Sequence, residues 1–384
     1  MRVLVGEGGL RVGGRAWAEV ESWETSRTGR GLLSQQPSPG SPAPKAESLK
    51  ARELCHLCIA GLHRVAERRG LVSGNRTKWG RPPPPGAETV CARSPIRWRH
   101  GIHWDSPNPA AESQGPRSYV GLPTAWAGSN HSELSRSGLP LCDVVINLAG
   151  ENVLNPRRRW NEAFQKEVLT SRLDTTHLLA KAITKAEHPP RAWILVTGVA
   201  YYKPSPTEEY DEDSPGGNFD FFSNLVTKWE EAARLPGEST RQVVVRSGVV
   251  LGRGGGAIGQ MLLPFRLGLG GPIGSGHQFF PWIHIGDLAG ILIHALEANH
   301  VQGVLNGVAP ASTTTNAEFA QALGAALGRP AFIPVPSIVV QAVFGRERAT
   351  MLLEGQKVVP RRTLATGYQY SFPELGAALK DIVA

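Results

Sequence analysis

A chain of 384 residues with 41% hydrophobic composition is long enough for one large α/β domain and a smaller piece. It has no run of about 18 apolar residues, so no transmembrane helix and no membrane partner are expected. It also begins without the basic region and long apolar core of a secretory signal. Four cysteines at this length favour a reducing compartment over a disulfide framework. We therefore expect an intracellular protein, either cytoplasmic or organellar.

The formal net charge of +8 comes entirely from the amino-terminal third of the chain. Residues 1–132 hold 18 Lys and Arg against 10 Asp and Glu, whereas residues 133–384 hold 23 of each. The neutral part is the one whose pattern is typical of an enzyme, so no nucleic-acid partner is expected. A small-molecule substrate is expected instead. The sequence predicts neither its identity nor the oligomeric state.

Residues 1–6 form a compact β-branched run that ends at Gly6 and predict a first Rossmann strand. A pyrophosphate loop should follow, because glycines let the backbone approach the phosphates at a helix N-terminus. The Gly-x-x-Gly-x-x-Gly spacing is broken, since position 12 is Val. An unstructured segment rich in Gly and Arg is therefore the favoured alternative.

Residues 7–132 have no pattern of a packed domain. From about residue 27 to 132 no apolar period persists, apart from one candidate helix near 49–69, and Pro, Arg and Ser interrupt the rest. Six of the ten Trp lie in residues 1–132, which is unusual for a disordered segment. We interpret residues 7–132 as a disordered insert or a replaced segment that arises from alternative splicing or a gene-model extension. Cys55 and Cys58 have the spacing of half a zinc site, but no second pair follows, so no metal is predicted.

The pattern becomes regular at Asp143, where a β-branched run ends in Gly150 and predicts a buried parallel strand that opens into a tight turn. Strands then alternate with helices, which is typical of a parallel sheet with right-handed crossovers. We expect an α/β, Rossmann-like doubly wound parallel sheet over 133–330 and a small C-terminal domain over 331–384. Further strands are predicted at 191–196, 242–251 and 301–308, and helices at 160–184, 218–234 and 315–327.

Several motifs recur through the regular part of the chain: Asn147-Leu148-Ala149-Gly150, Ala200-Tyr201-Tyr202, Lys228-Trp229-Glu230, Arg246-Ser247-Gly248 and Trp282-Ile283-His284. Together they resemble those of the atypical, extended short-chain dehydrogenases/reductases, and within that superfamily the epimerase branch called family 39U. The resemblance covers about two thirds of the chain, from residue 133 to the end. Residues 1–6 also fit the family's opening strand, whereas residues 7–132 do not fit.

The resemblance implies NADP as the cofactor and an oxidoreductase or epimerase activity. The turn has small residues that let its backbone lie against a nucleotide, and Arg172 offers a planar cation for a phosphate or an adenine face. Solvated helix charges are the alternative interpretation of Arg172 and Glu167. On the matching positions, the implied cofactor contacts are Gly6, Leu148, Ala149, Gly150, Glu167, Arg172 and Val250.

Short-chain reductases usually pair a Tyr with a Lys four residues later, and add a Ser or Thr from the preceding strand end. No Tyr in this sequence has a Lys at that spacing, and the residue four before Lys228 is Asn224. The candidate catalytic residues are therefore Thr197, Tyr201 and Tyr202. Two adjacent tyrosines in a turn cannot both point at one site, so one of them is expected to pack.

Three further segments have simpler interpretations. The acidic run Asp211 to Asp213 is expected to be solvated, and His284 is expected to stabilise the turn before Asp287. Residues 254–256, all glycine, are interpreted as a flap over the substrate or a flexible connection.

The predicted function is an NADP-dependent oxidoreductase or epimerase. Two alternatives stay open. A cofactor-binding protein without turnover is favoured by the missing Tyr and Lys pair. A defective isoform is the other, because residues 7–132 replace the phosphate loop and the second strand.

Overall fold

The computed structural model describes residues 3–7, 124–127, 134, 138–253, 255–311 and 313–384. The candidate helix near 49–69, the Cys55 and Cys58 pair and the glycines after Glu7 lie outside these residues. The segment 7–132, for which disorder is expected, also lies outside them, apart from Glu7 at the end of β1 and residues 124–127.

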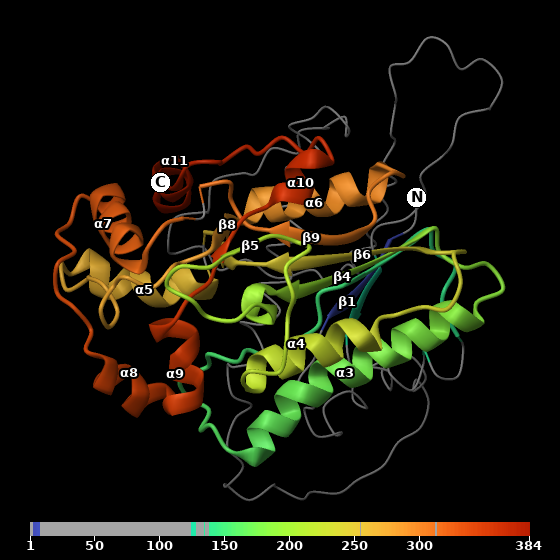
Figure 1. The fold of residues 1–384 in the computed structure, drawn as a ribbon, viewed down its shortest axis with the longest axis horizontal. Helices are drawn as coiled ribbons and strands as arrows, with labels where there is room; N and C mark the ends of the chain where they lie inside the picture. The colour runs from blue at the N-terminus through green and yellow to red at the C-terminus, as the bar shows by residue number, and fades with distance from the viewer. Residues whose placement is uncertain (1–2, 8–123, 128–133, 135–137, 254, 312) are drawn as a thin grey trace, which may run out of the picture.

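Six parallel strands form the central sheet, in the order β2-β1-β3-β4-β6-β9 (Figure 1). Because β1 lies between β2 and β3, the chain leaves β1 towards one side and then crosses to the other. This reversal makes the β1/β3 boundary the topological switch point, where open α/β sheets bind ligands. The predicted Rossmann-like sheet is confirmed. Its strands are β1 Val3–Glu7, β2 Thr124–Ala127, β3 Val144–Asn147, β4 Ala192–Gly198, β6 Arg241–Ser247 and β9 Gly303–Gly307.

Strand β2 lies in a stretch where no strand was predicted, so that prediction is wrong for residues 124–127. The strand has only four residues, Thr-Ala-Trp-Ala. So short a segment cannot show a period of two, and its pairing with β1 becomes visible only in the assembled sheet.

Helices cover both faces of the sheet. α3 (Glu162–Lys185) and α4 (Phe221–Ala232) lie on one face, and α6 (Ile285–Glu297) lies on the other (Figure 1). Alternate strand residues face opposite layers, as the pleat requires. Ile194 packs with the α6 core, whereas Trp193 and Leu195 pack with α3 and α4.

Capping residues begin the three predicted helices one to three residues after the predicted starts. The Asn161 side chain accepts a hydrogen bond from the Phe164 N–H and begins α3. Asp220 and Ser223 form a capping box that begins α4, and Thr315 and Glu318 form another that begins α7 (Asn316–Leu327).

The single strand predicted over 242–251 is in fact two strands in different sheets. β6 ends at Ser247, and β7 (Val249–Leu251) pairs with β8 (Trp282–His284) in a separate two-stranded sheet. The break falls at Gly248, where a Cβ would lie 2.6 Å from the Pro281 carbonyl oxygen. Only glycine allows this close approach, because any side chain would collide with that backbone.

The remaining elements follow the sheet in the chain or connect its strands. Cores of apolar residues join α11 to α5 and α7. None of the helices in the described part is both long and apolar enough to cross a membrane. The boundary at residue 330 stays a prediction. The elements are η2 Val199–Tyr201, β5 Glu209–Tyr210, α5 Gly256–Arg266, α8 Ser337–Phe344, α9 Arg346–Leu353, β10 Lys357–Val358, α10 Arg361–Ala365 and α11 Leu375–Val383.

Candidate functional site

The turn after β3 is shaped by the side chain of Asn147. This buried side chain accepts a hydrogen bond from the Ala149 N–H at 3.0 Å, and its amide donates to the Thr176 hydroxyl of α3 at 2.9 Å. Asn147 therefore folds the turn back on itself and ties it to the helix beneath. Sequence reasoning missed this role, although an Asn directly before a turn is the usual signal of such a bond.

Arg172 lies directly beneath the turn. A Cβ built on Gly150 would lie 2.9 Å from the Arg172 guanidinium carbon, so any side chain there would force the guanidinium or the turn to shift. The guanidinium donates to the Glu151 carbonyl at 2.9 Å and the Val168 carbonyl at 3.1 Å, and lies 5.1 Å from the Trp229 ring centroid. Burial lowers the pKa of Arg172 to about 10, which leaves it charged at neutral pH. Arg172 is therefore not a solvated surface charge.

Glu167 lies on the same helix but makes a different contact. Its carboxylate pairs with Arg158 of the loop before α3, and the guanidinium of Arg158 lies 4.5 Å from the Phe164 ring centroid. This pair is about one third exposed. Burial, with Glu167 nearby, raises the pKa of Glu151. The structure thus places Glu167 beside the loop that follows the turn.

The other predicted cofactor contacts gather at the same edge of the sheet. Gly6 of β1 lies in register with Asn147 of β3, across the switch point. Leu148 and Val250 are half-buried and pack against one core cluster beneath α6. The fold thus brings together the carboxyl ends of β1 and β3 and the start of β7.

A second group of polar residues lies at the carboxyl ends of β4 and β6. Arg246 of β6 is buried and donates to both carboxylate oxygens of Glu230, at 2.9 and 2.8 Å. Thr197 donates to Glu230 at 3.2 Å. Burial alone would lower the pKa of Arg246, but the hydrogen bonds and charge of Glu230 raise it. We call Thr197, Glu230, Arg246, Tyr202 and Asn306 the polar network.

Tyr202 is the packed member of the tyrosine pair. Its side chain is fully buried, its hydroxyl donates to the Asn306 side chain at 2.9 Å, and Arg246 donates to that hydroxyl at 3.0 Å. Burial raises the pKa of Tyr202, and the charge of Arg246 opposes this only in part. At neutral pH Tyr202 is therefore a neutral, fully hydrogen-bonded side chain.

Tyr201 is placed differently, although it is the adjacent residue. It is half-buried, its ring centroid lies 3.3 Å from the Arg246 guanidinium carbon, and a Cβ at Gly216 would lie 2.2 Å from the ring. Within the described part of the chain, no hydrogen bond uses its hydroxyl. Of the two tyrosines, Tyr201 is thus the one whose hydroxyl remains able to donate to a ligand.

Helix α4 contributes an acid to this region rather than a lysine. Lys228 is exposed, whereas Glu230, two residues later, lies in the polar network. Sequence reasoning missed the pairing of Glu230 with Arg246. The available signal was a single arginine within the apolar run Val-Val-Val-Arg, because a charge in a buried strand needs a partner.

The acidic run after β5 corrects one prediction, because Glu212 is buried rather than solvated. Its carboxylate accepts hydrogen bonds from the backbone N–H groups of Asn306, Arg362 and Thr363, at 2.9 to 3.1 Å. The pairing of β5 with β10 carries Glu212 against α10. No local pattern could show this, since the two strands are far apart in the sequence.

The prediction for His284 is confirmed. Its Nδ1 accepts a hydrogen bond from the Gly286 N–H at 3.1 Å and caps α6. Asp287 in turn accepts from the backbone N–H groups of Ser371 and Phe372. Gly254 lies outside the described residues, so the flap stays a prediction.

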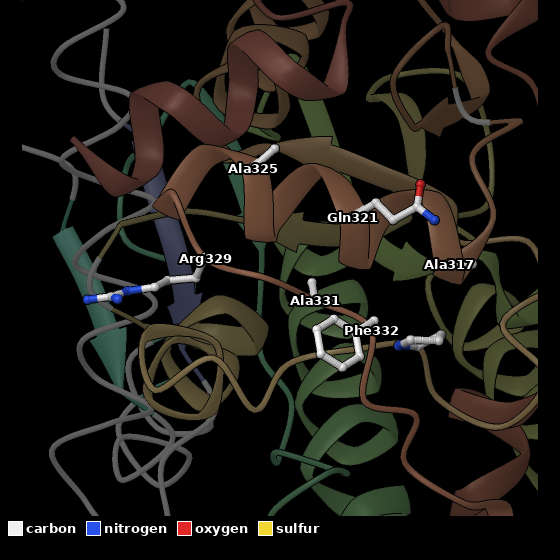
Figure 2. A pocket seen from close by; sticks show the side chains of 7 residues that line it. Ala317, Gln321, Ala325, Arg329, Ala331 and Phe332 are labelled. Carbon is white, nitrogen blue, oxygen red and sulfur yellow. The ribbon is translucent and has the colours of Figure 1, made fainter.

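A pocket of about 530 Å³ lies elsewhere, along α7 and the segment that follows it (Figure 2). None of its lining residues belongs to the turn or to the polar network. We therefore place the candidate site at the strand ends. The pocket is lined by Pro272, Ala317, Gln321, Ala325, Arg329, Ala331 and Phe332.

The parallel sheet with its reversal at β1, the tight turn at that point and the polar network beside it define a Rossmann-type α/β protein. Known proteins agree with this. The epimerase family protein SDR39U1 of Mus musculus is 91% identical over 253 residues, which cover 66% of this chain and 86% of the mouse protein. The chain belongs to the SDR39U1 epimerase family.

Two solved structures and one domain model complete the comparison. The crystal structure of human SDR39U1 (isoform 2) with NADPH is 81% identical, has a TM-score of 0.66 and covers 68% of this chain and 88% of its own. A UDP-glucuronic acid 4-epimerase from Bacillus cereus, 18% identical with a TM-score of 0.52 over 66% of this chain and 77% of its own, shares the fold. Residues 335–382 match a domain of unknown function, DUF1731.

Proposed function

We propose that this chain is an NADP-dependent oxidoreductase that holds NADPH across the carboxyl ends of β1 and β3. One observation carries the proposal: the Asn147-shaped turn lies at the switch point of the sheet, in a family whose human member is crystallised with NADPH. Small residues at the turn let a dinucleotide approach the backbone there.

The residues around the turn fit such a cofactor. The backbone of residues 148–150 would lie against the nucleotide, with Gly6 opposite and Val250 at the side. Both terminal nitrogens of Arg172 already donate to carbonyls, so its role would be to support the turn and to place a positive charge beneath it. Glu167 would act through the loop residue Arg158.

The chemistry would need a proton donor near the nicotinamide. NADPH, when bound, supplies a hydride to a carbonyl carbon. The Tyr201 hydroxyl would donate the proton to the carbonyl oxygen, because it is the tyrosine hydroxyl of the pair without a protein partner among the described residues. Arg246, stacked on the Tyr201 ring and fixed by Glu230, would hold that ring in place. Thr197 would orient Glu230 or the substrate oxygen.

A cofactor-binding protein without turnover is the second candidate. The hydroxyls of Thr197 and Tyr202 are both engaged within the polar network, so two of the three candidate hydroxyls already have partners. The Lys that usually accompanies the catalytic Tyr is missing, and α4 instead presents Glu230, which pairs with Arg246. The defective isoform, which would not bind NADPH, is the third.

Fluorescence titration with NADPH, followed by NADPH oxidation assays with a panel of carbonyl compounds, separates the three. We expect binding and turnover, and we expect Tyr201→Phe to lower turnover by about a hundredfold or more while its NADPH affinity stays within about twofold. Tyr210→Phe is the matched control, because Tyr210 stacks on Tyr202 at 5.3 Å outside the polar network. Binding without turnover would favour the second candidate, and no binding would favour the third.

A further inference from the structure

Arg348 of α9 is a buried arginine that is held by backbone carbonyls. It is 1% exposed, and among the described residues no carboxylate pairs with it. Its Nε donates to the Phe344 carbonyl at 2.7 Å. Burial lowers the pKa of Arg348. Burying a guanidinium without an acid is costly, so its hydrogen bonds must satisfy the charge.

The remaining partners of Arg348 lie about 190 residues earlier in the chain. Its Nη atoms donate to the carbonyls of Val153, Asn155 and Arg158, at 3.2, 3.0 and 2.9 Å. All three carbonyls belong to residues 151–160, which we call the β3–α3 loop. This loop directly follows the turn that would hold the cofactor.

The β3–α3 loop is thus held from two sides. On the inner side, Arg172 donates to the Glu151 carbonyl, and the Ser171 hydroxyl accepts from the Glu151 N–H at 3.1 Å. On the outer side, Arg348 satisfies three carbonyls that belong to no strand. Two arginines from distant elements therefore fix one loop.

The neighbouring residue of α9 adds a second contact. Glu347 accepts hydrogen bonds from the Trp160 indole and, at 2.8 Å, from the Gln165 side chain. Trp160 ends the β3–α3 loop, and Gln165 lies in the first turns of α3. The guanidinium of Arg348 also lies 5.4 Å from the Trp160 ring centroid. Helix α9 therefore contacts the loop along most of its length.

We propose that Arg348 is a positioning residue of the NADPH site: from the DUF1731 region it fixes the β3–α3 loop, and through the loop it fixes the turn at residues 148–150. This inference rests on the proposed binding of NADPH at that turn. A site ordered before binding loses less entropy when the ligand binds, so the loop contacts should appear as affinity.

Arg241 provides a matched control within the chain. It also donates to carbonyls, those of Ala295 and Val301, at 2.7 and 2.6 Å. It begins β6 and so lies at the amino-terminal end of the sheet, opposite the candidate site. Arg241→Lys therefore removes the same kind of contact where no cofactor is expected.

The test compares full-length wild type, Arg348→Lys and Arg241→Lys. For Arg348→Lys we expect about tenfold weaker NADPH binding in a fluorescence titration. We also expect faster hydrogen exchange of the amides of residues 148–160 in the protein without NADPH. Arg241→Lys should lower the midpoint of unfolding by about as much as Arg348→Lys does. Its NADPH affinity should stay within about twofold of wild type.

Unchanged exchange over 148–160 in Arg348→Lys, or an affinity loss no larger than that of Arg241→Lys, would overturn the inference. Failure of wild type to bind NADPH would overturn the proposed function instead, and the exchange data would still decide whether Arg348 orders the loop. If Arg348→Lys does not fold, Glu347→Gln takes its place. Its NADPH affinity is expected to fall by about threefold. No loss in that variant would count against the proposal.

Discussion

At the scale of single residues, the site depends on how buried polar groups are satisfied. Asn147 folds the turn, and Glu230 neutralises Arg246. The amide of Asn147 and the charge of Arg246 would both be costly to bury without these hydrogen-bond partners. The two adjacent tyrosines show the same principle: Tyr202 is fixed by two hydrogen bonds, whereas the contacts that Tyr201 makes with the described residues are ring contacts. The chemistry of a side chain here follows from its partners more than from its type.

Gly150→Ala tests the close approach beneath the turn. Its Cβ would lie 2.9 Å from the Arg172 guanidinium carbon, so Arg172 or the turn must shift. We expect NADPH affinity to fall by about tenfold, because the turn moves away from the position in which it is proposed to bind the cofactor. The measurement is a fluorescence titration. Gly259→Ala in α5 is the control, because its Cβ would meet no atom of the described residues within 4 Å, apart from its own helix backbone. Equal effects in both variants would contradict the account.

At the scale of elements, the site is assembled where strands end and where helices bring side chains to those ends. Helix α4 presents Glu230 to β6, and helix α3 presents Arg172 to the turn. The break between β6 and β7 at Gly248 lets the chain leave the main sheet one residue after Arg246, at the end of β6. The carboxyl edge of the sheet is therefore built by several elements, and its stability depends on contacts between them.

Glu230→Gln tests the contact between α4 and β6. The substitution leaves Arg246, whose side chain is 4% exposed, without its counter-charge. We expect the free energy of unfolding, measured by urea denaturation, to fall by about 3 kcal/mol. Lys228→Gln on the same helix should change it by no more than about 0.5 kcal/mol, because Lys228 is exposed. Combining Glu230→Gln with Arg246→Met should recover part of the loss; a purely additive double variant would refute the coupling.

At the scale of the whole molecule, distant parts of the chain cooperate in one site. From the DUF1731 region, Arg348 donates hydrogen bonds to the β3–α3 loop, and backbone N–H groups of α10 donate to the buried Glu212. The neutral charge balance of residues 133–384 fits a small-molecule site rather than a polyanion surface. The amino-terminal third adds the positive charge but lacks the glycine spacing of a phosphate loop.

A chimera tests the consequence of that missing spacing. Replacing the residues after Val5 with a Gly-x-x-Gly-x-x-Gly turn and helix start should tighten NADPH binding by about tenfold or more, because backbone N–H groups would then contact the pyrophosphate. The comparison is a titration of both chains under identical salt. An equally spaced Ala-x-x-Ala-x-x-Ala version is the control, and equal affinity in all three chains would refute the role assigned to the glycines.

The sequence by itself determined the alternation of strands and helices, the turn after β3, the absence of a Tyr and Lys pair and the role of His284 in stabilising the turn before Asp287. Each of these features depends on residues that lie close together in the chain, so local periodicity and spacing are enough to predict it. Only the tertiary structure decided that Tyr202 is buried, that Glu212 is shielded by α10 and that β2 joins the sheet. It also decided that the Arg348 guanidinium donates hydrogen bonds to carbonyls of the β3–α3 loop. Such contacts join residues far apart in the chain, and they exist only once the layers have packed.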